Sequence, residues 1–422
     1  MPYRSLALTP RVRSGEHPVG IDPTSLLLIE RAQARYYDVD PARMPASLSD
    51  REMQDCAFVD VELLRATIES LGGSIESISN PTGAAWRTRP ACFRTTRRCN
   101  VKLELHRISV GKLAFGAQTG VSGGVLTINK DELASLLLQD DRLSAVAVDV
   151  AHPGENVRIM PVKDAIEPRC KLEGPGEVFP GWIGDVENAG EGKTLVLGGM
   201  AVLTTGRVVA PQEGIVDMSG PGADYTPFSR TCNVVLSFDT AEDLEPHQRE
   251  ACYRIAGLKA AHYLASACKD AAADSVEAYD FPPLAEAMHQ HPGLPKVAYM
   301  YMLQSQGLLH DTWVYGVDAK RILPTMISPT NMMDGAIISG NCVSACDKNN
   351  TYVHLNNPVI KSLYEHHGKD LNFVGVIITN ENVTLADKKR SSSYAVKLAR
   401  MLGVDAVVIS EEGFGNPDAT SS

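Results

Sequence analysis

Short runs of apolar, alternating or β-branched residues recur between residues 101 and about 215. Gly, Asp and Pro residues, which favour turns, separate these runs. The pattern predicts strands over residues 101–110, 112–115, 125–129, 145–150 and 157–162. We therefore expect this part of the chain to be β-rich.

After about residue 232 the pattern alternates between apolar strands and helical stretches. Strands are predicted over residues 233–238, 296–303, 336–339, 373–379 and 406–410, and helices over residues 246–272, 359–367 and 392–402. Such alternation predicts an α/β fold with an open, mostly parallel sheet. Ligands bind beyond the carboxyl ends of the strands in such sheets, so residues 340–342, 380–382 and 411–413 are expected to converge on one crevice.

Lysine usage divides the chain more sharply than hydropathy does. Residues 1–100 contain 13 Arg and no Lys, whereas residues 101–422 contain 16 Lys and 11 Arg. We predict an N-terminal extension over residues 1–100, a β-rich domain over 101–231 and an α/β domain over 232–422.

Composition and charge exclude several functional classes. The formal net charge of −11 argues against nucleic acid as the main partner. Near the N-terminus the longest apolar run is residues 26–29, which is too short for a membrane span or a signal peptide, so we expect a cytoplasmic protein. The nine cysteines lack zinc-type Cys-x-x-Cys pairs and are interpreted as reduced thiols.

Cys342 is the strongest candidate for chemistry, because it follows Gly340 and Asn341 at the end of an apolar run. Gly and Asn tolerate positive φ, so the Asn341–Cys342 bond can lie in a strained turn where the thiol reaches the preceding carbonyl. On these residues alone, a small buried cysteine is the more common explanation. If the Asn341–Cys342 bond cleaves itself, Asp347, Lys348 and His354 are candidates for assisting that cleavage, although each could equally be an ordinary loop residue.

Long, irregular sequence strings place this motif in a wider context. They include residues 101–105, 123–130, 158–164, 217–227, 301–307 and 339–350. Over about residues 101–418 the chain resembles the component B proproteins of glycine reductase and of its sarcosine and betaine counterparts. The resemblance implies self-cleavage between Asn341 and Cys342 that leaves a pyruvoyl group, and it favours processing over the buried-cysteine explanation. It also implies that the α/β domain over residues 232–422 is truncated at its C-terminus.

The resemblance also implies a function: the precursor of the substrate-binding subunits of an amino-acid reductase complex. The pyruvoyl ketone derived from Cys342 would bind the amine of glycine or an N-methylated glycine as a Schiff base. A selenocysteine-containing subunit of component B and a small carrier selenoprotein would be partners in the reductive deamination, and the full complex would produce acetyl phosphate. We expect no metal or nucleotide cofactor, and we expect the protein to form an oligomer. The choice between glycine, sarcosine and betaine as substrate stays open.

Four residues are predicted to contact the substrate. Asp224 and Tyr225 end a Gly-Pro-Gly loop whose backbone N–H groups can face an anion, although such a loop is also a simple turn signal. His310 follows one of the family strings, and Asn380 follows a predicted strand.

Two other functions fit the same residues. In a pyruvoyl-dependent amino-acid decarboxylase the carbonyl would accept the electrons left when carbon dioxide departs, so carbon dioxide as product would identify it. A non-catalytic scaffold subunit of the reductase would remain uncleaved, which an intact-mass measurement detects.

Overall fold

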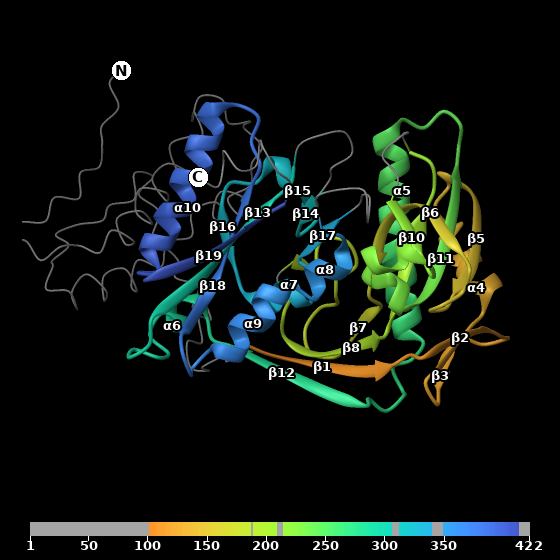
Figure 1. Cartoon of the computed structure of the whole chain (residues 1–422), viewed down its shortest axis with the longest axis horizontal. Coiled ribbons are helices and arrows are strands. Elements are labelled where there is room, and N and C mark those ends of the chain that lie inside the picture. Colours follow the sequence, from red (N-terminus) through yellow and green to blue (C-terminus); the bar gives the residue numbers. More distant parts are fainter. Residues whose placement is uncertain (1–100, 187–188, 209–213, 306–311, 340–348, 413–422) are drawn as a thin grey trace, which may run out of the picture. The chain divides into compact units, whose positions relative to one another are not determined.

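The computed structural model describes residues 101–186, 189–208, 214–305, 312–339 and 349–412, and everything below refers to these residues. They form a mixed α/β fold with several sheets of mixed strand direction (Figure 1). The candidates Asn341, Cys342, Asp347, Lys348 and His310 lie outside the described residues.

Two sheets contain most of the strands expected before residue 240. One has the order β12-β1-β8-β7, formed by Ser275–Phe281, Val101–Ser109, Gly192–Gly198 and Arg169–Glu173. The other has the order β10-β6-β9-β11-β5, formed by Gly214–Asp217, Arg158–Ile166, Met200–Thr205, Cys232–Thr240 and Leu143–Ala151. Both sheets pair strands from the two sides of residue 231, and the domain division proposed from the sequence stays a prediction.

The long helix α5 (Pro246–Ser266) packs against β6, β7 and β9. It begins at Pro246 after a capping box in which the side chains of Glu245 and Gln248 bind each other's backbone N–H groups. Its many alanines let the helix approach the strands closely, and Ala260, Ala261 and Ala265 are fully buried.

A third sheet, with the order β16-β18-β13-β19, is the α/β part of the fold. Its strands are Thr325–Ile327, Asn372–Asn380, Lys296–Leu303 and Ala406–Glu411. β13 runs parallel to β18 and to β19, while β16 is antiparallel to β18. Every residue of β18 is buried, as expected for an inner strand covered on both faces.

Helices connect and cover this third sheet. α10 (Leu385–Met401) packs against β18, and α6 (Leu284–Ala287) contacts the same strand (Figure 1). The remaining helices are α4 (Lys130–Leu137), α7 (Pro329–Met333), α8 (Thr351–Leu355) and α9 (Pro358–His366), with 3-10 turns η2 (Pro221–Tyr225), η3 (Pro227–Arg230) and η4 (Ala319–Arg321).

Two small sheets complete the fold. β2 (Lys112–Phe115) and β3 (Gly120–Ser122) flank β4 (Val125–Ile128). β14 (Thr312–Val314) lies between β15 (Val317–Asp318) and β17 (Ile337–Ser339), and both pairings are antiparallel.

The position of β17 corrects one expectation. The sequence places residues 336–339 in the parallel sheet, whereas Ile337–Ser339 pairs with β14 in a separate antiparallel sheet. A three-residue apolar strand carries no signal for its partner, because pairing is decided by contacts with residues distant in sequence. Residues 340–342 therefore do not follow a strand of the parallel sheet.

Candidate functional site

Four side chains meet where the carboxyl ends of β13 and β19 lie next to each other. We call Tyr301, Asn349, His354 and Glu412 the strand-end cluster. Tyr301 belongs to β13, Glu412 directly follows β19, and Asn349 and His354 belong to the segment that enters and forms α8. All but Asn349 are at most 2 % exposed. The parallel pairing of Met302 with Glu411 brings the two strand ends together.

Hydrogen bonds tie the strand-end cluster together through the Glu412 carboxylate. It accepts bonds from the backbone N–H groups of Gln304 at 2.8 Å and Asn349 at 2.9 Å, and from the Tyr301 hydroxyl at 3.3 Å. His354 Nε2 lies 3.6 Å from the same carboxylate, while His354 Nδ1 lies 3.1 Å from the Tyr301 hydroxyl. A buried carboxylate with several donors is satisfied without contact with water.

Electrostatics keep Tyr301 neutral. Burial, followed by the neighbouring Glu412 and Tyr299, raises the pKa of the Tyr301 phenol well above its usual value. The phenol therefore acts as a hydrogen-bonding group, and it also accepts a bond of 2.7 Å from Asn349 Nδ2. Together, a neutral hydroxyl, an imidazole and a carboxylate form a chain along which a proton can move.

The residues on both sides of segment 340–348 are anchored. On one side, Ser339 donates its N–H to Thr351 Oγ1 at 2.9 Å, and Thr351 N–H donates to Asp164 at 2.9 Å. On the other side, Asn349 is held by Tyr301 and Glu412 of the strand-end cluster. The segment that contains Cys342 is thus flanked by the buried Ser339 and the partly exposed Asn349, and both are hydrogen-bonded.

A second segment with a predicted site residue starts beside the first. Thr312 and Ser339 are directly opposite in the antiparallel pairing of β14 with β17. Thr312 follows residues 306–311, which include His310, and Ser339 precedes residues 340–348. The two segments therefore leave the described structure from neighbouring positions.

The other predicted site residues are not brought together with His354. Asn380 ends β18 and is buried, and its amide donates to the carbonyls of Ala319 at 2.7 Å and Ile322 at 3.3 Å. Asp224 and Tyr225 lie in η2 beside β10, and Tyr225 is 88 % exposed. Among the described residues, neither contacts the strand-end cluster.

The sequence analysis included Tyr301, Asn349 and Asp164 only within the family strings and Glu412 only within a strand-end string, and it assigned none of them a role. A usable signal was present, since Asp164 and Glu412 are acidic residues within or directly after predominantly apolar strands. Buried carboxylates are rare unless paired, so such positions indicate a network.

The described residues contain neither a candidate metal cluster nor a helix that could span a membrane. Over this part of the chain, no cluster of His, Cys, Asp or Glu has the composition of a metal site. Its helices are all too short or too polar to cross a bilayer.

Comparison with known proteins identifies relatives over most of the chain. The family described as glycine/sarcosine/betaine reductase component B subunits matches residues 101–421. The glycine reductase complex component B subunits alpha and beta of Acetoanaerobium sticklandii are 59 % identical over 318 residues, which is 75 % of this chain and 74 % of the relative.

Two further relatives come from Peptoclostridium acidaminophilum. The sarcosine reductase complex component B subunit alpha is 56 % identical over 75 % of this chain and 74 % of its own length. The betaine reductase complex component B subunit alpha is 40 % identical over 76 % of this chain and 74 % of its own length. No solved structure matches the chain.

Proposed function

The chain belongs to the family of glycine/sarcosine/betaine reductase component B subunits, and from this premise we propose that it is a self-cleaving precursor of the substrate-binding subunits. Its relatives are parts of reductase complexes, which makes it a subunit of an oxidoreductase complex. The relative at 59 % identity carries two subunit names for one chain, which supports cleavage of a precursor.

The proposed cleavage occurs at the Asn341–Cys342 bond. The Cys342 thiol attacks the Asn341 carbonyl and the peptide nitrogen takes up a proton, giving a thioester. Elimination breaks the Cβ–S bond, so that the sulfur leaves with Asn341 as a thiocarboxylate and residue 342 becomes dehydroalanine. Water then replaces the α-nitrogen, which departs as ammonia and leaves a pyruvoyl terminus.

The pyruvoyl ketone supplies a covalent binding site for the substrate amine as a Schiff base, which no ordinary side chain offers. The residues next to it must orient the segment and move protons. We assign proton transfer to His354, since its imidazole lies between the Tyr301 hydroxyl and the Glu412 carboxylate. Asn349, Ser339 and Thr351 would hold the ends of the segment in place.

The reduction itself is assigned to partners. The sequence contains no selenocysteine, so a separate selenocysteine-containing subunit and a small carrier selenoprotein would complete the reductive deamination of glycine or an N-methylated glycine. The glycine and sarcosine relatives are similarly close, at 59 % and 56 % identity, so identity does not select one of these two substrates.

Intact-mass spectrometry of the purified chain tests the proposal. We expect two fragments, residues 1–341 and 342–422, and borohydride should add mass only to the second by reducing its ketone. Cys342→Ala should abolish both cleavage and labelling, because alanine has no nucleophile and no leaving group at Cβ. Cys342→Ser should cleave slowly through the analogous ester.

Cys346→Ala is the matched control, since it removes a thiol from the same segment. Cleavage and labelling should stay at wild-type levels in this variant. An uncleaved chain in active enzyme, or unchanged borohydride labelling in Cys342→Ala, would refute the pyruvoyl proposal.

A further inference from the structure

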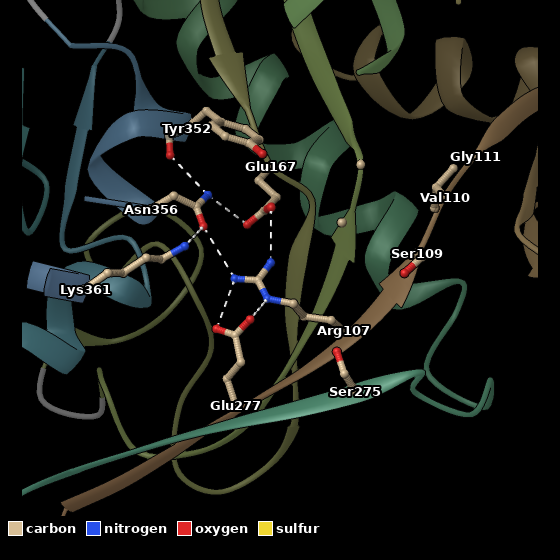
Figure 2. Close-up of a pocket in the computed structure, with 12 residues that line it drawn as sticks. Arg107, Ser109, Val110, Gly111, Glu167, Ser275, Glu277, Tyr352, Asn356 and Lys361 are labelled. Atoms are coloured by element: carbon tan, nitrogen blue, oxygen red, sulfur yellow. Dashed lines mark hydrogen bonds and ion pairs between the residues drawn. The ribbon is translucent and has the colours of Figure 1, made fainter. Parts of the chain in front are cut away.

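A polar pocket is lined in part by Tyr352 of α8 and by Asn356, which directly follows this helix. Its cavity has a volume of about 560 Å³, within the range of small-molecule sites. Charged and amide side chains dominate the lining (Figure 2), namely Arg107, Glu167, Glu277, Asn356 and Lys361. These residues come from β1, the end of β6, β12, the end of α8 and α9.

The charges around Asn356, on the wall of this pocket, do not balance. Arg107 pairs with Glu277 at 2.5 Å and with Glu167 at 3.4 Å, and the fully buried Arg169 also donates to Glu167, at 3.0 Å. Burial opposes the ionisation of Glu167, but the two arginines outweigh it and lower the pKa of that carboxyl. With Lys361, three cations therefore face two carboxylates.

Of these three cations, Lys361 is the one that has no carboxylate within ion-pair distance among the described residues. Its Nζ donates to Asn356 Oδ1 at 3.0 Å, and in the described part of the chain it forms no ion pair. Burial and then the nearby Arg107 lower the pKa of the Lys361 ammonium. Glu167 and Glu277 oppose this shift but do not cancel it.

All three cations converge on one neutral atom. Asn356 Oδ1 accepts hydrogen bonds from Lys361 at 3.0 Å, Arg169 at 3.3 Å and Arg107 at 3.4 Å, as Figure 2 shows for Arg107 and Lys361. A carbonyl oxygen carries only a partial negative charge, so it cannot neutralise this group. An anion next to Lys361 would make charge-assisted hydrogen bonds there.

From this geometry we infer that the pocket binds a small free monocarboxylate, with Lys361 as its principal anchor. One negative charge balances the excess of one positive charge. A dianion such as phosphate would meet the carboxylates of Glu167 and Glu277, and a cation would meet Lys361 and Arg107. The Ser109 and Ser275 hydroxyls on the pocket wall offer further polar contacts.

The test is a titration of the 422-residue chain with acetate, followed by saturation-transfer NMR at constant ionic strength. Acetate should saturate, whereas phosphate and methylammonium should not. Lys361→Gln should weaken acetate binding about tenfold or more, the order expected for loss of a charge-assisted hydrogen bond. Lys361→Arg should retain binding.

Two control variants make the result specific. Lys369→Gln removes the same charge from an exposed lysine just beyond α9 and should leave acetate binding unchanged. Cys342→Ala should also bind acetate normally, because this pocket does not use the pyruvoyl group, so the two proposals can fail separately. Absence of saturable binding, equal binding by Lys361→Gln, or tighter binding of phosphate would overturn the inference.

Discussion

At the scale of single residues, the stability of this structure is most sensitive to substitution of its buried charges. Glu167 is 1 % exposed and Arg169 is fully buried, and the pair is joined by Asn356, whose Nδ2 donates to Glu167 at 3.0 Å. Such a pair adds little net stability, but removing one partner leaves an uncompensated charge in the interior. Single substitutions here should therefore have large effects.

Glu167→Gln should lower the free energy of unfolding by about 3 kcal/mol at neutral pH, because Arg169 and Arg107 lose their buried counter-charge. The pKa of Glu167 in the folded protein lies below its ordinary value of 4.5. The ionised carboxylate therefore contributes its full stabilisation at pH values above about 4.5, the ordinary pKa. This contribution is lost as the pH falls through the lower pKa of the folded protein. The difference between wild type and variant should shrink below that pH.

Denaturant unfolding at neutral pH and at pH values below 4.5 measures this difference. Glu173→Gln is a suitable control, because Glu173 pairs with Lys193 at the surface and is 69 % exposed. It should unfold nearly as wild type does. Equal stability of Glu167→Gln and wild type at neutral pH would show that the buried pair is dispensable.

At the scale of elements, the helix α8 contributes residues both to the strand-end cluster and to the lining of the Lys361 pocket. It has only five residues, which is too short for a helix to be stable by itself. Its stability depends on its neighbours and on Asn350, whose side chain accepts a bond of 3.1 Å from Val353 N–H. His354 of this helix joins the strand-end cluster, while Tyr352 and Asn356 line the other pocket.

Asn350→Ala should therefore cost about 1 kcal/mol of stability, the usual loss for a removed N-cap. It should also slow cleavage at Asn341–Cys342, because His354 and Asn349 would be positioned less firmly. Asn350→Asp, which keeps an acceptor, should recover most of both losses. Urea unfolding and the rate of fragment formation by mass spectrometry measure the two effects. A normal cleavage rate in Asn350→Ala would separate α8 from processing.

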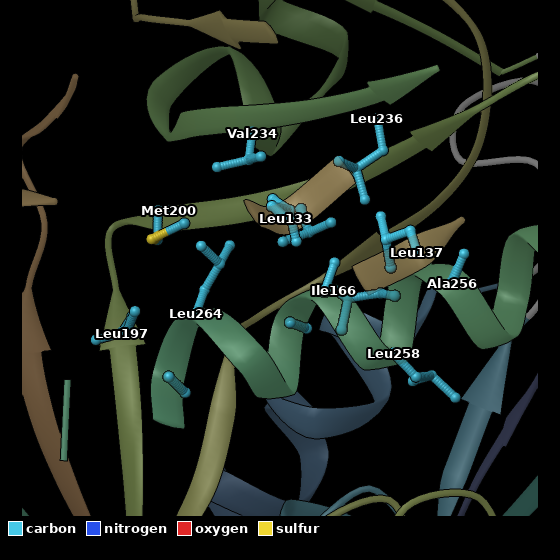
Figure 3. Packing of buried hydrophobic residues seen from close by; sticks show 14 of the residues in the cluster. Leu133, Leu137, Ile166, Leu197, Met200, Val234, Leu236, Ala256, Leu258 and Leu264 are labelled. Carbon is cyan, nitrogen blue, oxygen red and sulfur yellow. The ribbon is translucent and has the colours of Figure 1, made fainter. Parts of the chain in front are cut away.

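The helix α5 shows the opposite case, an element that a hydrophobic core holds in place. Ala256 and Leu264 of α5 lie among Ile166, Met200 and Leu236, which belong to the sheet β10-β6-β9-β11-β5 (Figure 3). Its bounds were close to the prediction, since Pro246–Ser266 lies inside the expected range of 246–272. The start of helix α10 was predicted less well, because the charged run Asp387–Arg390 hides its first turns. Thr384 caps the helix, which begins at Leu385, seven residues before the predicted start at 392.

At the scale of the whole molecule, the parallel sheet combines strands from both sides of Asn341–Cys342. β13 precedes this bond in the chain, and its two neighbours β18 and β19 follow it. Arg107 and Glu167 likewise contact Asn356 from the other side of the bond. Cleavage would therefore cut the chain without cutting the sheet or its core.

The fragments 1–341 and 342–422 should consequently remain together after cleavage. We expect them to elute as one species in size-exclusion chromatography under native conditions and to separate only in denaturant, because main-chain hydrogen bonds and shared core contacts hold β13 between β18 and β19. Cys342→Ala, eluting uncleaved at the same volume, is the reference. Separate elution of the fragments in native buffer would contradict this arrangement.

Local patterns predicted part of the strands and helices, such as β1, β13, β18 and α5, and they singled out Cys342 as the candidate for chemistry. Alternating apolar residues, caps and turn residues act over a few positions, so they can be read without a fold. The tertiary structure decided the rest. It paired β17 with β14 in a separate antiparallel sheet, and it joined Tyr301 with Glu412 and Arg107 with Asn356, pairs that lie 111 and 249 residues apart. Such contacts leave no periodic trace in the sequence, because they depend on which strand ends and helix faces the folded chain brings together.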